Sequence, residues 1–379
     1  MTIGVLKEVP EENRISLLPD AVSQLTKKGF AVKVQSDAGS RSFATDKDYE
    51  SAGAEILNVG DVIAQSEVIL SIHQPLVEIP AGKVLIGVYQ PLMNTNIISN
   101  AAKAGLTLFS LDMLPRTTRA QSMDVLSSQA NIAGYKAVLL AAHLYPRYFP
   151  MFMTAAGSIV PAKVLILGAG VAGLQAVATA RRLGAVVEVF DTRPAVKEEV
   201  MSLGAKFVEV EGAADASSAG GYAVEQTEEY KAKQNQKISD SIAKADIVIT
   251  TAQIPGKKAP LLISDEMLDR MRNGSVIIDI AAATGGNTPY TKNNETIIHK
   301  GVSIIGNSNL PATMPSDASK LYGKNILNFL SLISDKEGNL NLNWDDDLVK
   351  GSCITHNGEI VHERLKGEVV EGIKEGIIQ

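Results

Sequence analysis

The chain has 379 residues, of which 45% are hydrophobic and 21% charged, and its formal net charge is −6. So long a chain exceeds what one typical core organises, which predicts two domains. The negative charge argues against nucleic-acid binding, because phosphate contacts need a basic face. Cys353 is the single cysteine, which excludes an intramolecular disulfide and a cysteine-rich zinc site, and we expect no metal.

The N-terminal stretch MTIGVLKEVPEENR contains acidic residues and lacks a long apolar segment, so it does not have the pattern of a signal peptide. The longest apolar runs, such as VIIDIAAA, are well short of a membrane span. We therefore expect no direct membrane span and a reducing, cytoplasmic location. Association with a membrane protein remains open.

Residues 1–115 alternate strand-like and helix-like segments. Helix-like stretches such as PDAVSQLTKKG and ISNAAKAG lie between the short apolar runs TIGVLKE, AVKVQS, EVILSI, VLIGVY and LTLFSL. This alternation predicts a parallel sheet. No glycine-rich phosphate loop follows the first of these strands.

Two long helical patterns, over residues 124–144 and 316–334, bracket a second set of strand-like runs. The expected fold is α/β, with two Rossmann-like doubly wound parallel-sheet domains linked by these two long helices. We predict a discontinuous N-terminal domain of residues 1–125 plus 320–379, and a nucleotide-binding Rossmann domain of residues 126–319. Two domains that simply follow one another along the chain are the alternative.

The sequence GAGVAG follows the strand-like run VLIL and opens a helix-like segment. In a dinucleotide site, the first glycine (Gly168) permits the tight turn and the second (Gly170) lets the backbone approach a pyrophosphate. The third (Gly173) lets helix and strand pack closely. The helix N-terminus, with Val171 and Ala172, supplies N–H groups and partial positive charge for that pyrophosphate.

Asp191 ends the next strand-like run, VVEVF, at the spacing of the acid that binds a ribose hydroxyl. It would repel a 2′-phosphate, which favours NAD(H) over NADP(H), although Arg193 nearby is a residue type that binds such a phosphate. TTAQIPG at residues 250–256 lies where the far half of a dinucleotide passes, and a plain strand-end turn is the alternative. The predicted NAD(H)-binding residues are Gly168, Gly170, Gly173, Val171, Ala172, Asp191, Thr192, Arg193, Ala252 and Gln253.

A dehydrogenase that oxidises an alcohol or an amine needs a group to accept a proton. Of the five histidines, His73 at a strand end is the candidate for a cleft. The polar segment RTTRAQSMDVLSSQA at residues 116–130 contains no His, Lys, Cys or Glu, so it can form hydrogen bonds but supplies little acid–base chemistry. A capped helix start, with Ser122 or Asp124 as N-cap, is the alternative interpretation of this segment.

These segments carry a resemblance to a known family. The opening GVLKEVPEENRISLLPDAVSQLTKKGFAVKV resembles the alanine dehydrogenase and proton-translocating nicotinamide nucleotide transhydrogenase superfamily. The segment RTTRAQSMDVLSSQANIAGYKA is similar to the one typical of the NAD(H)-binding alpha subunit, the domain I component, of transhydrogenases. The similarity continues through MTAAG, the glycine turn, an AGGY loop, TTAQIPGKKAP and VIIDIAAATGGN, and covers essentially the whole chain.

The resemblance implies direct hydride transfer between NAD(H) bound here and NADP(H) on a partner component. It also implies a membrane proton-channel component, a homodimer, and attachment to the inner membrane through the partner subunits. Family alpha chains that carry membrane helices are longer, so the end near EGIIQ suggests a separate subunit.

The resemblance also implies roles for residues of the 116–127 loop. Gln121 would bond the ribose next to the nicotinamide, and Asp124 and Ser127 would fix the carboxamide. Arg116 would anchor the carboxamide or the loop, in a charge-assisted pair with Asp124. Tyr222 would belong to a mobile loop that closes over the nucleotide, whereas the alternative for residues 211–237 is a solvated surface loop.

Two other functions compete with this one. In alanine dehydrogenases a lysine, a histidine and an aspartate handle the substrate, and the matching places here hold His73, Gln90 and Ala283. Arg14 remains, but an arginine positions a carboxylate and transfers no proton. A stand-alone amino-acid dehydrogenase would therefore depend on His73. A non-catalytic NAD(H)-sensing module is the third hypothesis, and the complete 116–127 loop argues against it.

Overall fold

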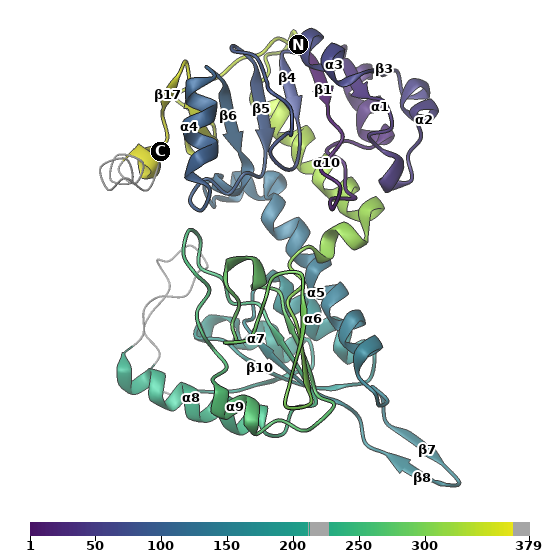
Figure 1. The fold of residues 1–379 in the computed structure, drawn as a ribbon, viewed down its shortest axis with the longest axis vertical. Coiled ribbons are helices and arrows are strands. Elements are labelled where there is room, and N and C mark those ends of the chain that lie inside the picture. Colours follow the sequence, from purple (N-terminus) through teal and green to yellow (C-terminus); the bar gives the residue numbers. More distant parts are fainter. Residues whose placement is uncertain (211, 213–226, 367–379) are drawn as a thin grey trace. The chain divides into compact units, whose positions relative to one another are not determined.

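The computed structural model describes residues 1–210, 212 and 227–366 (Figure 1). They form two compact units. The N-terminal unit comprises Met1–Gln129 and the described residues from Pro311 onward, and the central unit comprises the described residues of Ala130–Leu310. Each unit is an α/β fold built on a mainly parallel sheet, which confirms the predicted fold class.

The sheet of the N-terminal unit contains six parallel strands in the order β3-β2-β1-β4-β5-β6. Two short strands extend it antiparallel beyond β6, namely β16 (Cys353–His356) and β17 (Glu359–Ile360). The chain turns back across the sheet between β3 and β4, so the carboxyl ends of β1 and β4 form a topological switch point. The parallel strands are β1 (Thr2–Val5), β2 (Ala31–Gln35), β3 (Glu55–Leu57), β4 (Val68–Leu70), β5 (Val84–Gly87) and β6 (Thr107–Ser110).

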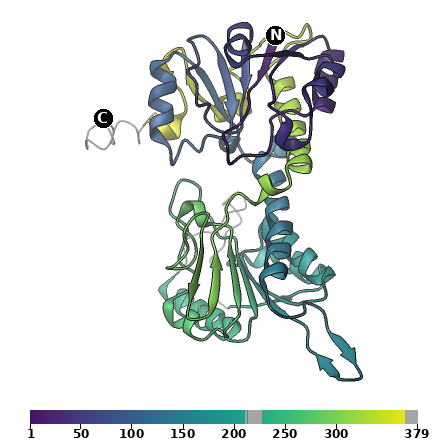
Figure 2. The ribbon, with the colours of Figure 1, turned by 45° about the vertical axis from the view of Figure 1, so that its right-hand side comes forward.

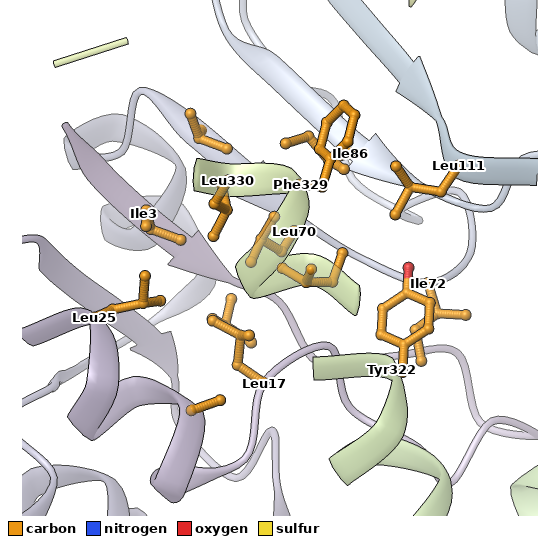
Figure 3. Packing of buried hydrophobic residues seen from close by; sticks show 14 of the residues in the cluster. Ile3, Leu17, Leu25, Leu70, Ile72, Ile86, Leu111, Tyr322, Phe329 and Leu330 are labelled. Carbon is orange, nitrogen blue, oxygen red and sulfur yellow. The ribbon is translucent and has the colours of Figure 1, made fainter. Parts of the chain in front are cut away.

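Helices cover both faces of this sheet, because successive strand side chains point to opposite sides. One face packs on α1 (Pro19–Lys27), α2 (Asp46–Ser51) and α10 (Pro315–Leu332). Figure 3 shows Tyr322, Phe329 and Leu330 of α10 packed among the strand residues Ile3 and Ile86. The other face packs on α3 (Val59–Gln65) and α4 (Thr95–Lys103).

The sheet of the central unit has the same topology, with the order β11-β10-β9-β12-β13-β15 and an antiparallel edge strand, β14. Its central strands β12 and β13 are buried throughout, as expected for a parallel sheet covered on both faces. The strands are β9 (Lys163–Leu167), β10 (Val186–Phe190), β11 (Lys206–Phe207), β12 (Ile247–Thr250), β13 (Val276–Asp279), β14 (Thr296–His299) and β15 (Val302–Ile305).

One face of this sheet packs on α5 (Val125–Leu144), α6 (Val171–Arg182) and α7 (Lys197–Ser202), and the other on α8 (Glu228–Ile242) and α9 (Asp265–Asp269). Helix α5 matches the long helix predicted at residues 124–144, and it begins in one unit and ends in the other. A separate hairpin, β7 (Phe152–Thr154) and β8 (Gly157–Ile159), projects from the central unit (Figure 2).

Candidate functional site

The glycine turn of the central unit connects β9 to α6. Gly168 has a φ of 105°, in the left-handed region that favours glycine. A Cβ on Gly173 would lie 1.9 Å from the Gly168 carbonyl oxygen, so this glycine lets the helix pack against the turn. A Cβ on Gly170 would meet nothing within 4 Å. The turn therefore has space beside Gly170 for a ligand to approach the backbone, at the N-terminus of a twelve-residue helix.

Val171 and Ala172 form the first turn of α6, Val171 exposed and Ala172 buried. Their backbone N–H groups are among the first four of the helix, which have no partner within it. Together with the partial positive charge of the helix end, these groups suit an anion such as a pyrophosphate.

Asp191, directly after β10, holds the glycine turn from the neighbouring strand. Its Oδ2 accepts a hydrogen bond from the Ala169 N–H at 2.7 Å. Arg193 donates to the same carboxylate from its backbone N–H at 2.8 Å, its Nε at 2.9 Å and its Nη2 at 2.7 Å. The acid predicted to read the ribose thus also fixes the phosphate turn, and Arg193 is paired with it. Thr192, between the two, is half-buried.

The loop after β12 lies against the same turn. The Thr251 hydroxyl donates to the Gly168 carbonyl at 3.1 Å. The Asn287 Nδ2 donates to the Ala252 carbonyl at 2.9 Å, and the Gln253 Nε2 donates to the Ile280 carbonyl at 3.2 Å. The predicted residues Ala252 and Gln253 therefore lie at the switch point between β9 and β12, where open α/β sheets bind ligands.

The sequence analysis missed the buried residues that support this loop. Asp279 is fully buried and accepts hydrogen bonds from the Ala281 N–H at 3.0 Å, the Asn287 N–H at 2.6 Å and the Thr291 hydroxyl at 2.6 Å. Asn287, also fully buried, donates to the carbonyls of Ala252 and Pro260. The signal available in the sequence was an Asp that ends a buried strand, followed by Gly-Gly-Asn.

The 116–127 loop of the N-terminal unit contains the 3₁₀ segment η3 (Thr118–Met123) and the start of α5. Arg116 and Gln121 are exposed, whereas Asp124 and Ser127 are half-buried. The Asp124 carboxylate accepts hydrogen bonds from the Ser127 N–H at 2.8 Å and the Ser127 hydroxyl at 2.6 Å. Asp124 therefore acts as the N-cap that one of the sequence interpretations expected, and the Arg116–Asp124 pair stays a prediction.

A buried ionic cluster lies at the switch point of the N-terminal unit. Arg14, 8% exposed, donates from Nε to Glu12 Oε1 at 2.8 Å and from Nη2 to Glu12 Oε2 at 2.6 Å. Its Nη1 donates to Gln129 Oε1 at 2.8 Å, and the His73 Nε2 lies 2.8 Å from Glu12 Oε2. Burial alone would raise the pKa of Glu12, but the hydrogen bonds from Arg14 and His73 outweigh it and lower that pKa to about 2.

This cluster bears on the dehydrogenase hypothesis. The arginine that would position a substrate carboxylate already holds the carboxylate of Glu12 in a bidentate pair. Glu8, beside the cluster, accepts hydrogen bonds from the backbone N–H groups of Ile72 and His73. Gln90 follows β5 with a φ of 50°, and Ala283 lies in the 3₁₀ segment Ala282–Thr284 of the other unit.

Three further observations bound the site. Tyr222 lies outside the described residues, so its predicted role stays a prediction. In the portion of the chain that the structure describes, no group of three or more His, Cys, Asp or Glu side chains is arranged to hold a metal ion. Over the same residues, no helix has both the length and the apolar character needed to cross a membrane.

Two Rossmann-like units, one with a complete dinucleotide turn, define the class as a nucleotide-binding oxidoreductase fold. The family models of the alanine dehydrogenase/PNT N-terminal and C-terminal domains match residues 4–133 and 137–363. The chain belongs to the alanine dehydrogenase/PNT family.

Within this family the chain is more similar to transhydrogenase subunits than to alanine dehydrogenases. It is 43% identical to an NAD(P) transhydrogenase subunit alpha chain of Rhodospirillum rubrum, over 97% of this chain and 100% of that one. It is 26% identical to alanine dehydrogenase of Mycolicibacterium smegmatis, over 96% of each chain. Its fold matches the crystal structure of transhydrogenase from Sinorhizobium meliloti with a TM-score of 0.87 and 44% identity, over 95% of this chain and 100% of that one.

Proposed function

We propose that this chain is the NAD(H)-binding component of a proton-translocating transhydrogenase. In the proposed reaction, NADH + NADP⁺ ⇌ NAD⁺ + NADPH, a hydride passes directly between NAD(H) bound here and NADP(H) bound to a partner component. A membrane component would couple the reaction to proton translocation. The observation that carries the proposal is the 43% identity to a transhydrogenase alpha subunit chain over its full length, against 26% to an alanine dehydrogenase.

The central unit would bind the dinucleotide. The residues present fit it, because a side chain at Gly170 would occupy space that is open in the structure and that a pyrophosphate needs. The α6 N-terminus would hold the pyrophosphate, and Asp191 would accept hydrogen bonds from the ribose. Ala252 and Gln253 would contact the far half of the molecule.

When bound, the two nicotinamide rings supply the redox chemistry, as donor and acceptor of the hydride. No O–H or N–H bond of a substrate is made or broken at that step, so the chain needs no general acid or base there. Its residues would orient one ring and exclude water. Gln121, Asp124, Ser127 and Arg116 would do this as hydrogen-bonding groups, and the absence of His, Lys, Cys and Glu from residues 116–127 agrees with such a role.

The proposed assembly places the chain on the cytoplasmic side of the inner membrane, attached through its partner subunits, as a homodimer. One observation supports association. The hairpin β7–β8 and its flanks expose a run of apolar side chains on the described surface: Tyr148, Met151, Phe152, Met153, Ile159 and Val160. Such a two-stranded ribbon is only marginally stable by itself, and an exposed apolar patch of this kind is typical of an interface.

Partner dependence tests the function. The purified chain is mixed with a soluble NADP(H)-binding component, and the reduction of an oxidised NAD analogue by NADPH is followed. The chain alone is incubated with NAD⁺ and L-alanine in parallel. We expect turnover only in the mixture. Turnover with alanine alone would instead establish an amino-acid dehydrogenase, and His73 would then be the first residue to substitute.

A further inference from the structure

We propose that Arg119, Asn325 and Asn328 are positioning residues that hold the 116–127 loop in the conformation needed for hydride transfer. The inference rests on the proposed function and extends it to side chains that would touch neither nucleotide. Its basis is a set of contacts that fix the backbone on both sides of Gln121, while the Gln121 side chain stays exposed.

The first anchor comes from α10. The Asn325 Nδ2 and the Asn328 Nδ2 both donate to the Ser122 carbonyl, at 2.8 and 2.9 Å. Residues three apart share one face of a helix, and one carbonyl oxygen has two lone pairs to accept both bonds. Asn325 is 7% exposed, and α10 is held in the core by Tyr322 and Phe329. The carbonyl next to Gln121 is therefore tied to a rigid element.

The second anchor comes from the segment before α11 (Asp347–Ser352). Arg119 donates through Nη1 to Asp346 Oδ2 at 2.7 Å, and through Nη2 to Asp346 Oδ1 and Asp347 Oδ1. Asp346 is itself fixed, because it is the N-cap of α11 and accepts the Leu348 N–H at 2.9 Å. This bidentate pair sets the orientation of the guanidinium as well as its distance.

The third contact is apolar. Ala120 and Met123, on either side of Gln121 and Ser122, are 4% and 5% exposed and belong to the core of the N-terminal unit. The backbone of η3 is thus fixed by the core, by α10 and by Asp346, and only the Gln121 side chain is presented outward. A reaction that depends on ring placement rather than on proton transfer is sensitive to such a support.

A purely structural role is the competing explanation. An exposed ion pair contributes little to stability, and the Arg119 side chain is 53% exposed. Loss of Arg119 should therefore leave the protein folded. If Arg119 matters for the reaction, the effect must come through the conformation of the loop.

The test uses the enzyme assembled from this chain and its partner components. The variants are Arg119→Met, Arg119→Lys, Asn328→Ala and the double variant Arg119→Met/Asn328→Ala. Arg270→Met is the matched control, because Arg270 is an exposed arginine of the central unit that bonds to Ser239 and Asp240. The measurements are kcat for NADPH-driven reduction of the NAD analogue, the Kd of NADH, the thermal midpoint, and amide hydrogen exchange of the peptide that contains residues 118–124.

We expect Arg119→Met to lower kcat by roughly tenfold and the double variant to lower it further. The Kd of NADH and the thermal midpoint should stay near the wild-type values, and amide exchange in the 118–124 peptide should speed up. Arg119→Lys should recover part of the rate, because lysine keeps the charge but loses the bidentate geometry. Arg270→Met should change none of these quantities.

Two results would overturn the inference by itself. One is an unchanged kcat in the variants against an active wild type, and the other is a loss of rate that only follows a loss of folded protein or of NADH binding. A wild-type enzyme that transfers no hydride in the presence of its partners is a different result. It would reject the proposed function, and the inference would be rejected with it.

Discussion

Two glycines of the same turn should respond to alanine substitution in different ways. At Gly173 a Cβ would lie 1.9 Å from the Gly168 carbonyl oxygen and 2.9 Å from its carbon, so the backbone must move. At Gly170 nothing lies within 4 Å of the added carbon. The φ of −75° and ψ of −171° at Gly170 are also accessible to alanine.

The magnitudes follow from these contacts. Overpacking of a well-packed site costs about 1–3 kcal/mol, so Gly173→Ala should lower the free energy of unfolding by that amount and disturb the turn. Gly170→Ala should keep the stability or raise it by about 0.4–1 kcal/mol, because alanine restricts the unfolded chain. Its Cβ would nevertheless keep a pyrophosphate from the backbone. A lost hydrogen bond to a charged group is worth about 1.5–3 kcal/mol, or roughly a 10- to 150-fold higher Kd for NADH.

The assay combines urea unfolding followed by circular dichroism with calorimetric titration of NADH. The expected result is a stable Gly170→Ala variant that binds NADH weakly, and a destabilised Gly173→Ala variant. Wild-type NADH affinity in Gly170→Ala would refute the assignment of the open space to the pyrophosphate. Wild-type stability in Gly173→Ala would refute the packing argument.

Three further predictions concern single side chains. Asp191→Asn places an NH₂ group against N–H donors, and we expect about a 10- to 150-fold higher Kd for NADH in calorimetric titration. An equal affinity would contradict the role of Asp191. Gln121→Asn should lower the rate of hydride transfer sharply in the coupled assay with little change in NADH binding, and a strong loss of binding would mean that its role is misassigned. Burial raises the pKa of Glu8 from 4.5 to about 7, so the native state keeps a proton that the unfolded chain releases near pH 4.5. The stability from Glu8 is therefore complete below pH 4.5 and falls by roughly 3 kcal/mol as pH rises through 7. Glu8→Gln should remove this fall, as measured by urea unfolding with the fluorescence of the single tryptophan, Trp344, and a fall of equal size in the variant would contradict the argument.

The regions of the fold that depend on local pattern could be predicted from the sequence. The parallel sheets follow from apolar runs that alternate with amphipathic segments, and α5 follows from its long helical pattern. The glycine turn has a local signature because each glycine answers a backbone constraint within a few residues, and the structure shows those constraints at Gly168 and Gly173.

The elements that the sequence analysis missed take their stability from distant partners. Strand β16 lies in a segment that reads as polar and turn-rich, and Cys353 pairs with Phe109 of β6. The two-residue β17 and the three-residue β3 are too short for a periodic signal. Neither segment has a pattern that separates it from a loop until the neighbouring strand is known.

The same reason limits the prediction of the site. The pairing of Glu12 with Arg14 involves residues two apart, whereas the bonds from Arg14 to Gln129 and from Asn325 to Ser122 join segments far apart in the chain. A sequence alone gives the residue types of such a site and the loop that holds them. The side chains that fix the loop become visible only once α10 is packed beneath it.

Direct hydride transfer is the central claim, and an isotope label tests it most directly. NADPH deuterated at both C4 positions is mixed with an oxidised NAD analogue, this chain and the NADP(H)-binding component in ordinary water. Mass spectrometry then measures deuterium in the reduced analogue. The proposed function predicts one deuterium per molecule of reduced analogue, because the hydride passes from ring to ring. Its replacement by solvent hydrogen, or reduction that proceeds equally without this chain, would contradict the claim.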